Sequence, residues 1–331
     1  MDVDEQALAG QGPAQTPHAD VTAGIAHRRR LTRRFALWCA GLMLATIVLS
    51  AFMRLSLAGL GCDDWPACYG QPLRDAAHGA SPASGAGLAL ARLAHRIVAS
   101  VVLVLVIVLV LATLGTRPRL QREGRLAAGL LVLALALAAL GLVTRGTTLP
   151  AVVLGNLLGG FVMLALSWRL AAAAAGRPAP AIELSRWARL GLALLVVQIA
   201  LGTMISGTYG ALACSGWPDC SRLALSAGWD WQSLNPWQQP ALEAEASNAA
   251  RGAWLHVLHR AGALLLLPVL MAVGLSARRH GHRGAATALW MLLALQLLVG
   301  GLLAGAGLPL IQVLLHNLTA ALLLALLTRL A

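Results

Sequence analysis

The 331-residue sequence has few charged residues and no lysine, so all 25 of its basic residues are arginine. Charged residues make up 11% of the chain and hydrophobic residues 58%, whereas soluble domains have about a quarter charged and about half apolar residues. This composition excludes a soluble globular protein and predicts a polytopic membrane protein. The absence of lysine supports no functional conclusion.

Acidic residues are also scarce, 13 against 25 arginines, which gives a net charge of +12. Such a charge could indicate nucleic-acid binding, but the arginines lie in short segments between apolar runs. That distribution is typical of the positive-inside rule for membrane proteins. We therefore expect these segments to face the cytoplasm, and we expect no nucleic-acid partner.

Apolar runs of about 20 residues, the length that crosses a bilayer, follow the first 34 residues. We expect eight spans, at 35–57, 88–114, 126–146, 151–175, 188–209, 253–275, 285–305 and 309–329. An even number puts both termini on one side, and the basic cluster at 27–34 predicts that this is the cytoplasmic side, which in a bacterium means an inner-membrane protein whose outward segments lie in the periplasm. Residues 1–34 are polar, small and Pro-containing, so we expect a disordered basic tail. It is not a cleavable signal, because no small-residue cleavage site follows the first span.

The chain contains an internal repeat. The pattern C-x-x-W-P-x-C occurs at 62–68 and at 214–220, and each copy precedes a span that opens with His-Arg, at His95 and at His259. Each half has four spans, so the second half enters the membrane in the same sense as the first, which makes the halves parallel repeats.

The repeat predicts an all-α membrane protein built from two four-helix bundles. The bundles are expected at 35–175 and 189–331, with a cytoplasmic linker at 176–188 between them. The longer and more acidic segments at about 59–87 and 210–252, which contain the cysteine motifs, are expected in the periplasm.

Cysteine occurs only five times, and four of the five lie in the two repeat motifs. The pairs Cys62–Cys68 and Cys214–Cys220 are close enough in sequence to form disulfides, which persist in the periplasm. Both pairs could be structural, and the first could instead be redox-active. Neither pair has the further ligands that a zinc site needs. Cys39 is expected to pack as a small apolar residue within the first span.

Three histidines, His95, His259 and His316, lie at matching depth inside apolar spans. An ionisable side chain in such a place is costly and indicates a functional site, and an imidazole there most often binds a metal or a heme iron. His259 and His316 belong to different helices of one bundle, as bis-imidazole ligation of a heme requires. His256, one helical turn from His259, is expected to be a boundary residue or a supporting partner.

Several arginines lie near the outward membrane edge rather than the cytoplasmic one. Their side chains could extend to the lipid headgroups, or they could bind heme propionates through bidentate hydrogen bonds. Both can hold for one side chain. The residues are Arg54, Arg92, Arg96, Arg145 and Arg260.

From residue 35 to its end the chain resembles the bacterial heme A synthase family. The resemblance rests on the segment from Arg54 through the first cysteine motif, the two His-Arg helix starts, Gln198-Ile-Ala-Leu-Gly202, the segment before Cys214, and His316-Asn317. It implies oxidation of the C8 methyl of heme O to a formyl group, which gives heme A for terminal oxidases.

The resemblance also implies the residues of two heme sites. Heme b would be the cofactor, with iron ligands at His259 and His316 and with Arg260 beside it. Heme O would bind in the N-terminal bundle, where His95 would be the catalytic residue and iron ligand, together with Arg54, Arg96 and Asn156. Heme O synthase and cytochrome oxidase subunits are the implied protein partners.

Two positions depart from the family pattern. Arg92 stands where the family has a glutamate, and Asn156 where it has a histidine. An asparagine is a poor iron ligand and an arginine cannot act as a carboxylate base. Either the substrate iron has His95 as its one protein ligand, or the chain has drifted from the parent reaction. The alternative functions are a non-catalytic heme-binding electron carrier or oxidase-assembly factor and, more distantly, a transporter.

Overall fold

A computed structural model of the chain describes residues 17–60, 64, 66–71, 75, 85–144, 147–176, 180–213, 217–240, 245–305 and 307–331. All regular secondary structure in these residues is helical. The elements are α1 (Pro17–Leu57), α3 (Ala86–Leu114), α4 (Gln121–Val143), α5 (Pro150–Ala174), α6 (Ile182–Gly207), α7 (Trp217–Ala227), the short 3-10 helix η1 (Trp231–Leu234), α8 (Glu245–Arg279), α9 (Arg283–Gly305) and α10 (Leu310–Leu330).

Eight of the helices are long and apolar enough to cross a membrane, namely α1, α3, α4, α5, α6, α8, α9 and α10. Each coincides with one of the apolar runs in the sequence, so the eight predicted spans are confirmed as helices. Large apolar side chains are exposed on their outer surfaces, for example Leu111 at 60% and Val132 at 68%. Such surfaces are costly in water and favourable in lipid, so the fold is that of a multi-pass membrane protein.

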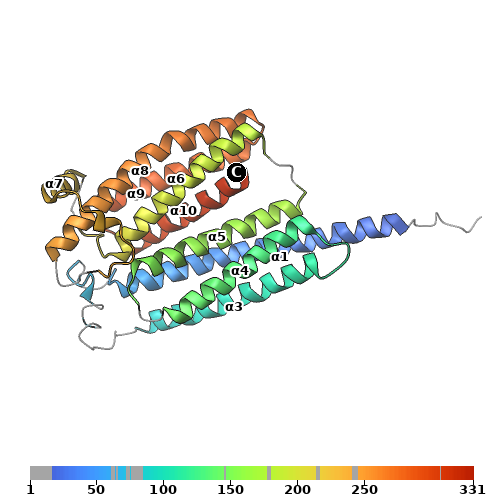
Figure 1. The fold of residues 1–331 in the computed structure, drawn as a ribbon, viewed down its shortest axis with the longest axis horizontal. Coiled ribbons are helices and arrows are strands. Elements are labelled where there is room, and N and C mark those ends of the chain that lie inside the picture. The colour runs from blue at the N-terminus through green and yellow to red at the C-terminus, as the bar shows by residue number, and fades with distance from the viewer. Residues whose placement is uncertain are drawn as a thin grey trace, which may run out of the picture.

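The helices form two groups of four. In the first group α1 and α4 each pack against α3 and α5, and in the second group α6 and α9 each pack against α8 and α10. Figure 1 shows the long helices running side by side, with α1 starting and α10 ending on the side away from α7. An even number of spans requires this arrangement of the ends.

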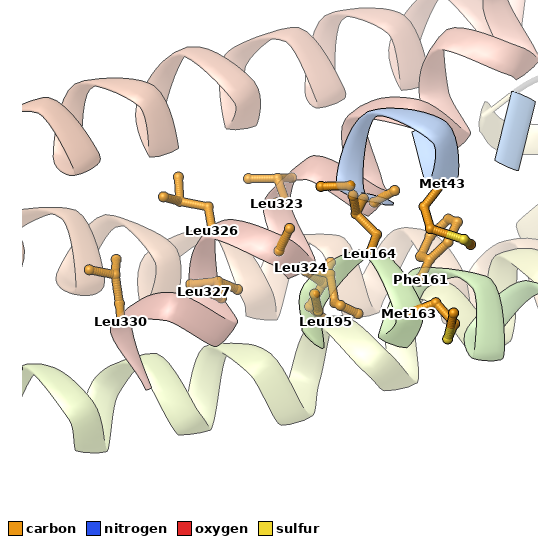
Figure 2. Close-up of a cluster of buried hydrophobic side chains, with 14 of the residues drawn as sticks. Met43, Phe161, Met163, Leu164, Leu195, Leu323, Leu324, Leu326, Leu327 and Leu330 are labelled. Carbon is orange, nitrogen blue, oxygen red and sulfur yellow. The ribbon is translucent and has the colours of Figure 1, made fainter. Parts of the chain in front are cut away.

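The two groups meet where α10 packs against α1 and α5, and where α5 packs against α6. Figure 2 shows the buried side chains of this region, including Met43 from α1, Phe161 from α5, Leu195 from α6 and Leu323 from α10. Each of these four side chains is less than 5% exposed. This continuous apolar core fixes the two groups of helices against each other.

The predicted disordered tail is wrong for residues 17–34, because α1 begins at Pro17 and includes the basic cluster. Arg28 donates hydrogen bonds to the hydroxyl of Thr116 and to the carbonyl of Pro118, in the connection between α3 and α4. Arg29 forms an ion pair of 3.0 Å with Glu123, whose side chain is 2% exposed. Arginine is a good helix former, and these partners hold the part of α1 around Arg28 and Arg29 against the start of α4 and the connection before it.

Two further boundaries differ from the prediction. Helix α6 begins at Ile182, inside the predicted linker 176–188, because Leu184 and Ala188 are buried in the core rather than exposed in a connection. Helix α8 begins at Glu245, eight residues before the predicted span, so it extends beyond the apolar run. The amphipathic helix α7 lies in the predicted periplasmic segment and packs against α8.

Candidate heme-binding site

His259 on α8 and His316 on α10 face each other inside the second group of helices. Helices α8 and α10 lie diagonally, each packing against α6 and α9. The centroids of the two imidazole rings are 6.4 Å apart, and the ring planes make an angle of 61°. Two metal–nitrogen bonds of about 2 Å, plus about 1 Å from each ring nitrogen to its centroid, place the rings of a bis-imidazole site about 6 Å apart. The observed separation matches this value.

The ring of His259 is fixed through its Nδ1 atom. Nδ1 lies 3.1 Å from the main-chain oxygen of Gln198 on α6, an acceptor, and 3.1 Å from the side-chain amide nitrogen of Gln198, a donor. That amide already donates to the main-chain oxygen of His259 at 2.6 Å, so we assign the ring hydrogen to Nδ1, which donates it to the Gln198 carbonyl. The lone pair of Nε2 is therefore left for a metal, the usual arrangement for a ligating histidine.

His316 is held through the opposite nitrogen. The side-chain amide nitrogen of Gln296, on α9, lies 3.1 Å from Nε2, so that Nε2 is the acceptor. The Thr319 hydroxyl has one hydrogen and three acceptors within reach, the main-chain oxygens of Leu315 and His316 and, nearest, the side-chain oxygen of Gln296; donation to this nearest oxygen orients the amide. The Nδ1 atom of His316 is buried and has no hydrogen-bond partner in the part of the chain that the structure describes. Burying a polar group in this way is unfavourable, and it is one sign of a functional site.

Two glycines make room for the rings. A Cβ atom added at Gly202, on α6, would lie 3.0 Å from Cε1 of His259, and one added at Gly300, on α9, would lie 3.1 Å from Cε1 of His316. Both distances are shorter than an ordinary van der Waals contact, which begins at 3.4 Å. Any larger residue at either position would press on an imidazole.

The donor set fits a heme better than an isolated metal ion. No group of three or more His, Cys, Asp or Glu side chains that could hold a metal occurs in the part of the chain that the structure describes. A protein zinc site needs three or four protein ligands. A heme iron takes four ligands from its porphyrin and needs only one or two from the protein, which His259 and His316 can supply.

His256 does not join the histidine pair. Its Nε2 atom lies 3.1 Å from the carbonyl oxygen of Gly210, in the connection that follows α6. His256 therefore ties the start of α8 to that connection, in line with the boundary role expected for it. Arg260 follows His259 on α8 and is half-buried.

No hydrogen bond, ion pair or ring contact among the described residues joins the residues predicted for the substrate to one another. His95 is half-buried on α3, and Arg96 beside it is exposed. Asn156 is exposed on α5, a helix diagonal to α3 in the first group. No hydrogen bond of the described residues joins His95 to Asn156. In contrast to the histidine pair, this region presents a single imidazole.

Arg54 lies at the boundary between the two groups of helices. Its guanidinium donates a hydrogen bond to the hydroxyl of Ser206, so that α1 is linked to α6. The ring centroids of Tyr69 and Tyr209 lie 6.1 Å apart nearby, with the ring planes tilted by 56°. Burial raises the pKa of Tyr209 to about 12, although the Arg54 cation opposes the shift. Burial also raises the pKa of Tyr69. Both phenols stay neutral at physiological pH, and Arg54 has no acidic partner among the described residues.

The remaining predicted residues are only partly described. Cys62, Cys214 and Arg145 lie outside the described residues, so both disulfides stay predictions. Cys39 is a free cysteine, and its side chain is fully buried in α1 as expected.

The sequence reasoning missed Gln296 and Thr319. A signal for Gln296 was available, because it stands four residues before Gly300 just as Gln198 stands four residues before Gly202.

The chain is similar to known proteins over most of its length. Residues 33–328 match the sequence family described as cytochrome oxidase assembly protein. The chain is 31% identical over 252 residues to the heme A synthase of Shewanella oneidensis, which covers 69% of this chain and 73% of that protein. It is 30% identical over 183 residues to the heme A synthase of Sphingopyxis alaskensis, which covers 50% of this chain and 45% of that protein.

Proposed function

Since the chain belongs to the family of cytochrome oxidase assembly proteins, we propose that it is a heme A synthase, a membrane oxidoreductase that oxidises the C8 methyl of heme O to a formyl group. The observation that carries the proposal is the pair of facing imidazoles, His259 and His316, at the separation that a heme iron requires. The names of the two relatives supply the product, heme A, and the family resemblance implies heme O as the substrate.

In this proposal His259 and His316 hold heme b, and Arg260 lies beside it at the start of the apolar part of α8. A bound heme supplies electron transfer, which protein side chains alone do not. The contribution of the chain is to present two neutral imidazoles, to fix their orientation through Gln198 and Gln296, and to exclude water with the surrounding apolar helices.

The N-terminal group of helices would receive heme O. His95 is the proposed catalytic residue and iron ligand, because it is half-buried and makes no hydrogen bond with the described residues that would occupy its nitrogens. Arg54 suits a propionate, since its guanidinium is bonded to a neutral hydroxyl and has no acidic partner in the described part of the chain. Arg96 and Asn156 complete the proposed substrate residues.

We place the protein in the bacterial inner membrane as two parallel four-helix repeats, with both termini in the cytoplasm and the cysteine segments in the periplasm. The positions of the helix ends support this topology, since α1 starts and α10 ends on one side and the arginine cluster of α1 lies on that side. Disulfides Cys62–Cys68 and Cys214–Cys220 belong to the same proposal, as do heme O synthase and cytochrome oxidase subunits as partners.

A second candidate function is a heme-binding electron carrier or oxidase-assembly factor without catalytic activity. It is favoured by Arg92 and Asn156, which replace the polar residues expected from the family, and by the exposure of Asn156 on α5. In this case the heme site of the second group of helices would be kept and the substrate chemistry lost.

Expression in a host that makes heme O but not heme A separates the two candidates. The proposal predicts heme A among the hemes extracted from membranes that contain the chain, and loss of heme A with His95→Ala while the bound heme b remains. Heme b in the purified protein without any heme A in the membranes would support the non-catalytic candidate instead. If His95→Ala made as much heme A as the parent, the assignment of the substrate site would be wrong.

A further inference from the structure

Two glutamines contact the two facing imidazoles in a repeated local pattern. Gln198 and Gly202 on α6 both touch His259, and Gln296 and Gly300 on α9 both touch His316. Residues four apart in a helix lie on one face, so each glutamine and glycine form one side of the pocket around their histidine. The two Gln-x-x-x-Gly segments are alike in sequence, but Gln198 contacts Nδ1 of its histidine whereas Gln296 contacts Nε2 of its own.

The contact of Gln198 leaves the metal-binding nitrogen of His259 free. The main chain of Gln198 takes the Nδ1 hydrogen, and the side-chain amide holds the main-chain oxygen of His259 at 2.6 Å. The amide thereby fixes the position of α8 along α6 and keeps Nδ1 within hydrogen-bonding distance of the Gln198 main-chain oxygen. His259 is ready to bind iron through Nε2 without any rearrangement.

The contact of Gln296 occupies Nε2 of His316, whereas Nδ1 of the same ring has no hydrogen-bond partner among the described residues. Its amide N–H is directed at Nε2, and Thr319 holds the amide in that orientation by donating to its oxygen. Thr319 is 1% exposed, so water does not compete for this bond. A lone pair that accepts a hydrogen bond cannot also bind a metal, so iron ligation by Nε2 requires the bond from Gln296 to break.

We propose that Gln198 and Gln296 are positioning residues with opposite effects on heme ligation. Gln198 holds His259 as the fixed axial ligand, whereas Gln296 competes with iron for Nε2 and makes His316 the exchangeable one. The inference rests on the proposed heme site at these two histidines. It distinguishes a fixed ligand from an exchangeable one, whereas the family resemblance implies only that both histidines are ligands.

The expected effects have opposite signs. Replacing Gln296 by Leu removes a neutral hydrogen bond that opposes ligation, so hemin should bind about 2- to 10-fold more tightly. Replacing Gln198 by Leu loosens the support of a ligating histidine, which should weaken hemin binding about 10-fold or more. Thr319→Val frees the amide of Gln296 to rotate and should change the affinity in the same direction as Gln296→Leu, by a smaller factor.

The test uses the purified full-length protein in detergent after removal of bound heme. Hemin is titrated in and followed by its Soret absorbance, and the reduced complex is then exposed to carbon monoxide, which binds iron only where an axial ligand leaves. Gln296→Leu should raise hemin affinity and lower the fraction of carbon monoxide complex, and Gln198→Leu should do the reverse. Gln121→Leu, on the exposed start of α4, and Thr328→Val, whose hydroxyl bonds only within α10, are the matched controls.

Weaker or unchanged hemin binding in both Gln296→Leu and Thr319→Val would overturn the inference, because Gln296 would then not compete with iron for Nε2. The proposed site is tested separately by His259→Ala and His316→Ala. If neither of these changes hemin binding, the heme site itself is wrong. If both histidine variants lose hemin binding, but Gln198→Leu and Gln296→Leu change hemin affinity in the same direction, the heme site stands and the inference falls. Thr319→Val keeps the test decisive should Gln296→Leu not fold.

Discussion

The adjacent glycines Gly300 and Gly301 on α9 allow a controlled test of the site geometry. A Cβ at Gly300 would lie 3.1 Å from Cε1 of His316, whereas nothing lies within 4 Å of a Cβ at Gly301. Ordinary contact begins at 3.4 Å, so in Gly300→Ala the ring must move by about 0.3 Å (3.4 − 3.1). That shift disturbs both the separation from His259 and the hydrogen bond to Gln296.

Overpacking of this kind costs about 1–3 kcal/mol, which corresponds to about 5- to 150-fold in affinity for a heme held by His316. Gly301→Ala has no such contact and should only gain about 0.5–1 kcal/mol of helix stability from the lower backbone entropy of alanine. Hemin titration and thermal unfolding by circular dichroism measure the two effects on each variant. Gly300→Ala should lose the bis-imidazole spectrum at hemin concentrations that saturate Gly301→Ala. Equal hemin affinities in the two variants would refute the contact between Gly300 and the ligand ring.

Two further predictions concern regions outside the heme site. Glu123→Gln removes the charge that pairs with the half-exposed Arg29, and this loss should cost about 1 kcal/mol of stability and lower the apparent unfolding temperature by about 2 °C. The control Glu183→Gln, on the exposed start of α6, should leave the unfolding temperature unchanged. Equal shifts in the two variants would contradict the role of the ion pair. Tyr69 and Tyr209 are the two tyrosines of the chain, and burial raises the pKa of each, that of Tyr209 to about 12. At pH 11 the folded protein should therefore have little tyrosinate absorbance at about 295 nm whereas the denatured chain, with phenol pKa values of about 10, should have most of it. Because the unfolded state can release these protons first, stability should fall as the pH rises from about 10 to about 12, and full ionisation of the folded protein at pH 11 would refute the burial.

The sequence predicted the membrane helices and the histidine pair well because both depend on strong local signals. In a chain with 11% charged residues, apolar runs long enough to cross a bilayer have few interpretations other than membrane helices. A histidine inside such a run is costly, so the conjunction of His259 and His316 in one half indicated a shared site. The structure brings those two rings together and leaves His95 apart from them.

The start of α1 and the support of His316 could not be predicted in the same way. The arginine cluster looks like the end of a span, and its helical structure depends on partners such as Glu123, which lies 94 residues from Arg29. The roles of Gln296 and Thr319 depend on which face of α9 meets which face of α10. Both helices are apolar on nearly every side, so periodicity does not identify the buried face.

The absorption spectrum of the purified protein tests the heme site, on which the whole account depends, most directly. The parent chain should show the low-spin spectrum of an iron with two imidazole ligands. His259→Ala and His316→Ala should each remove it, and His256→Ala should leave it intact because His256 bonds to the Gly210 carbonyl rather than to the pair. A low-spin spectrum that survives His259→Ala or His316→Ala would contradict the account.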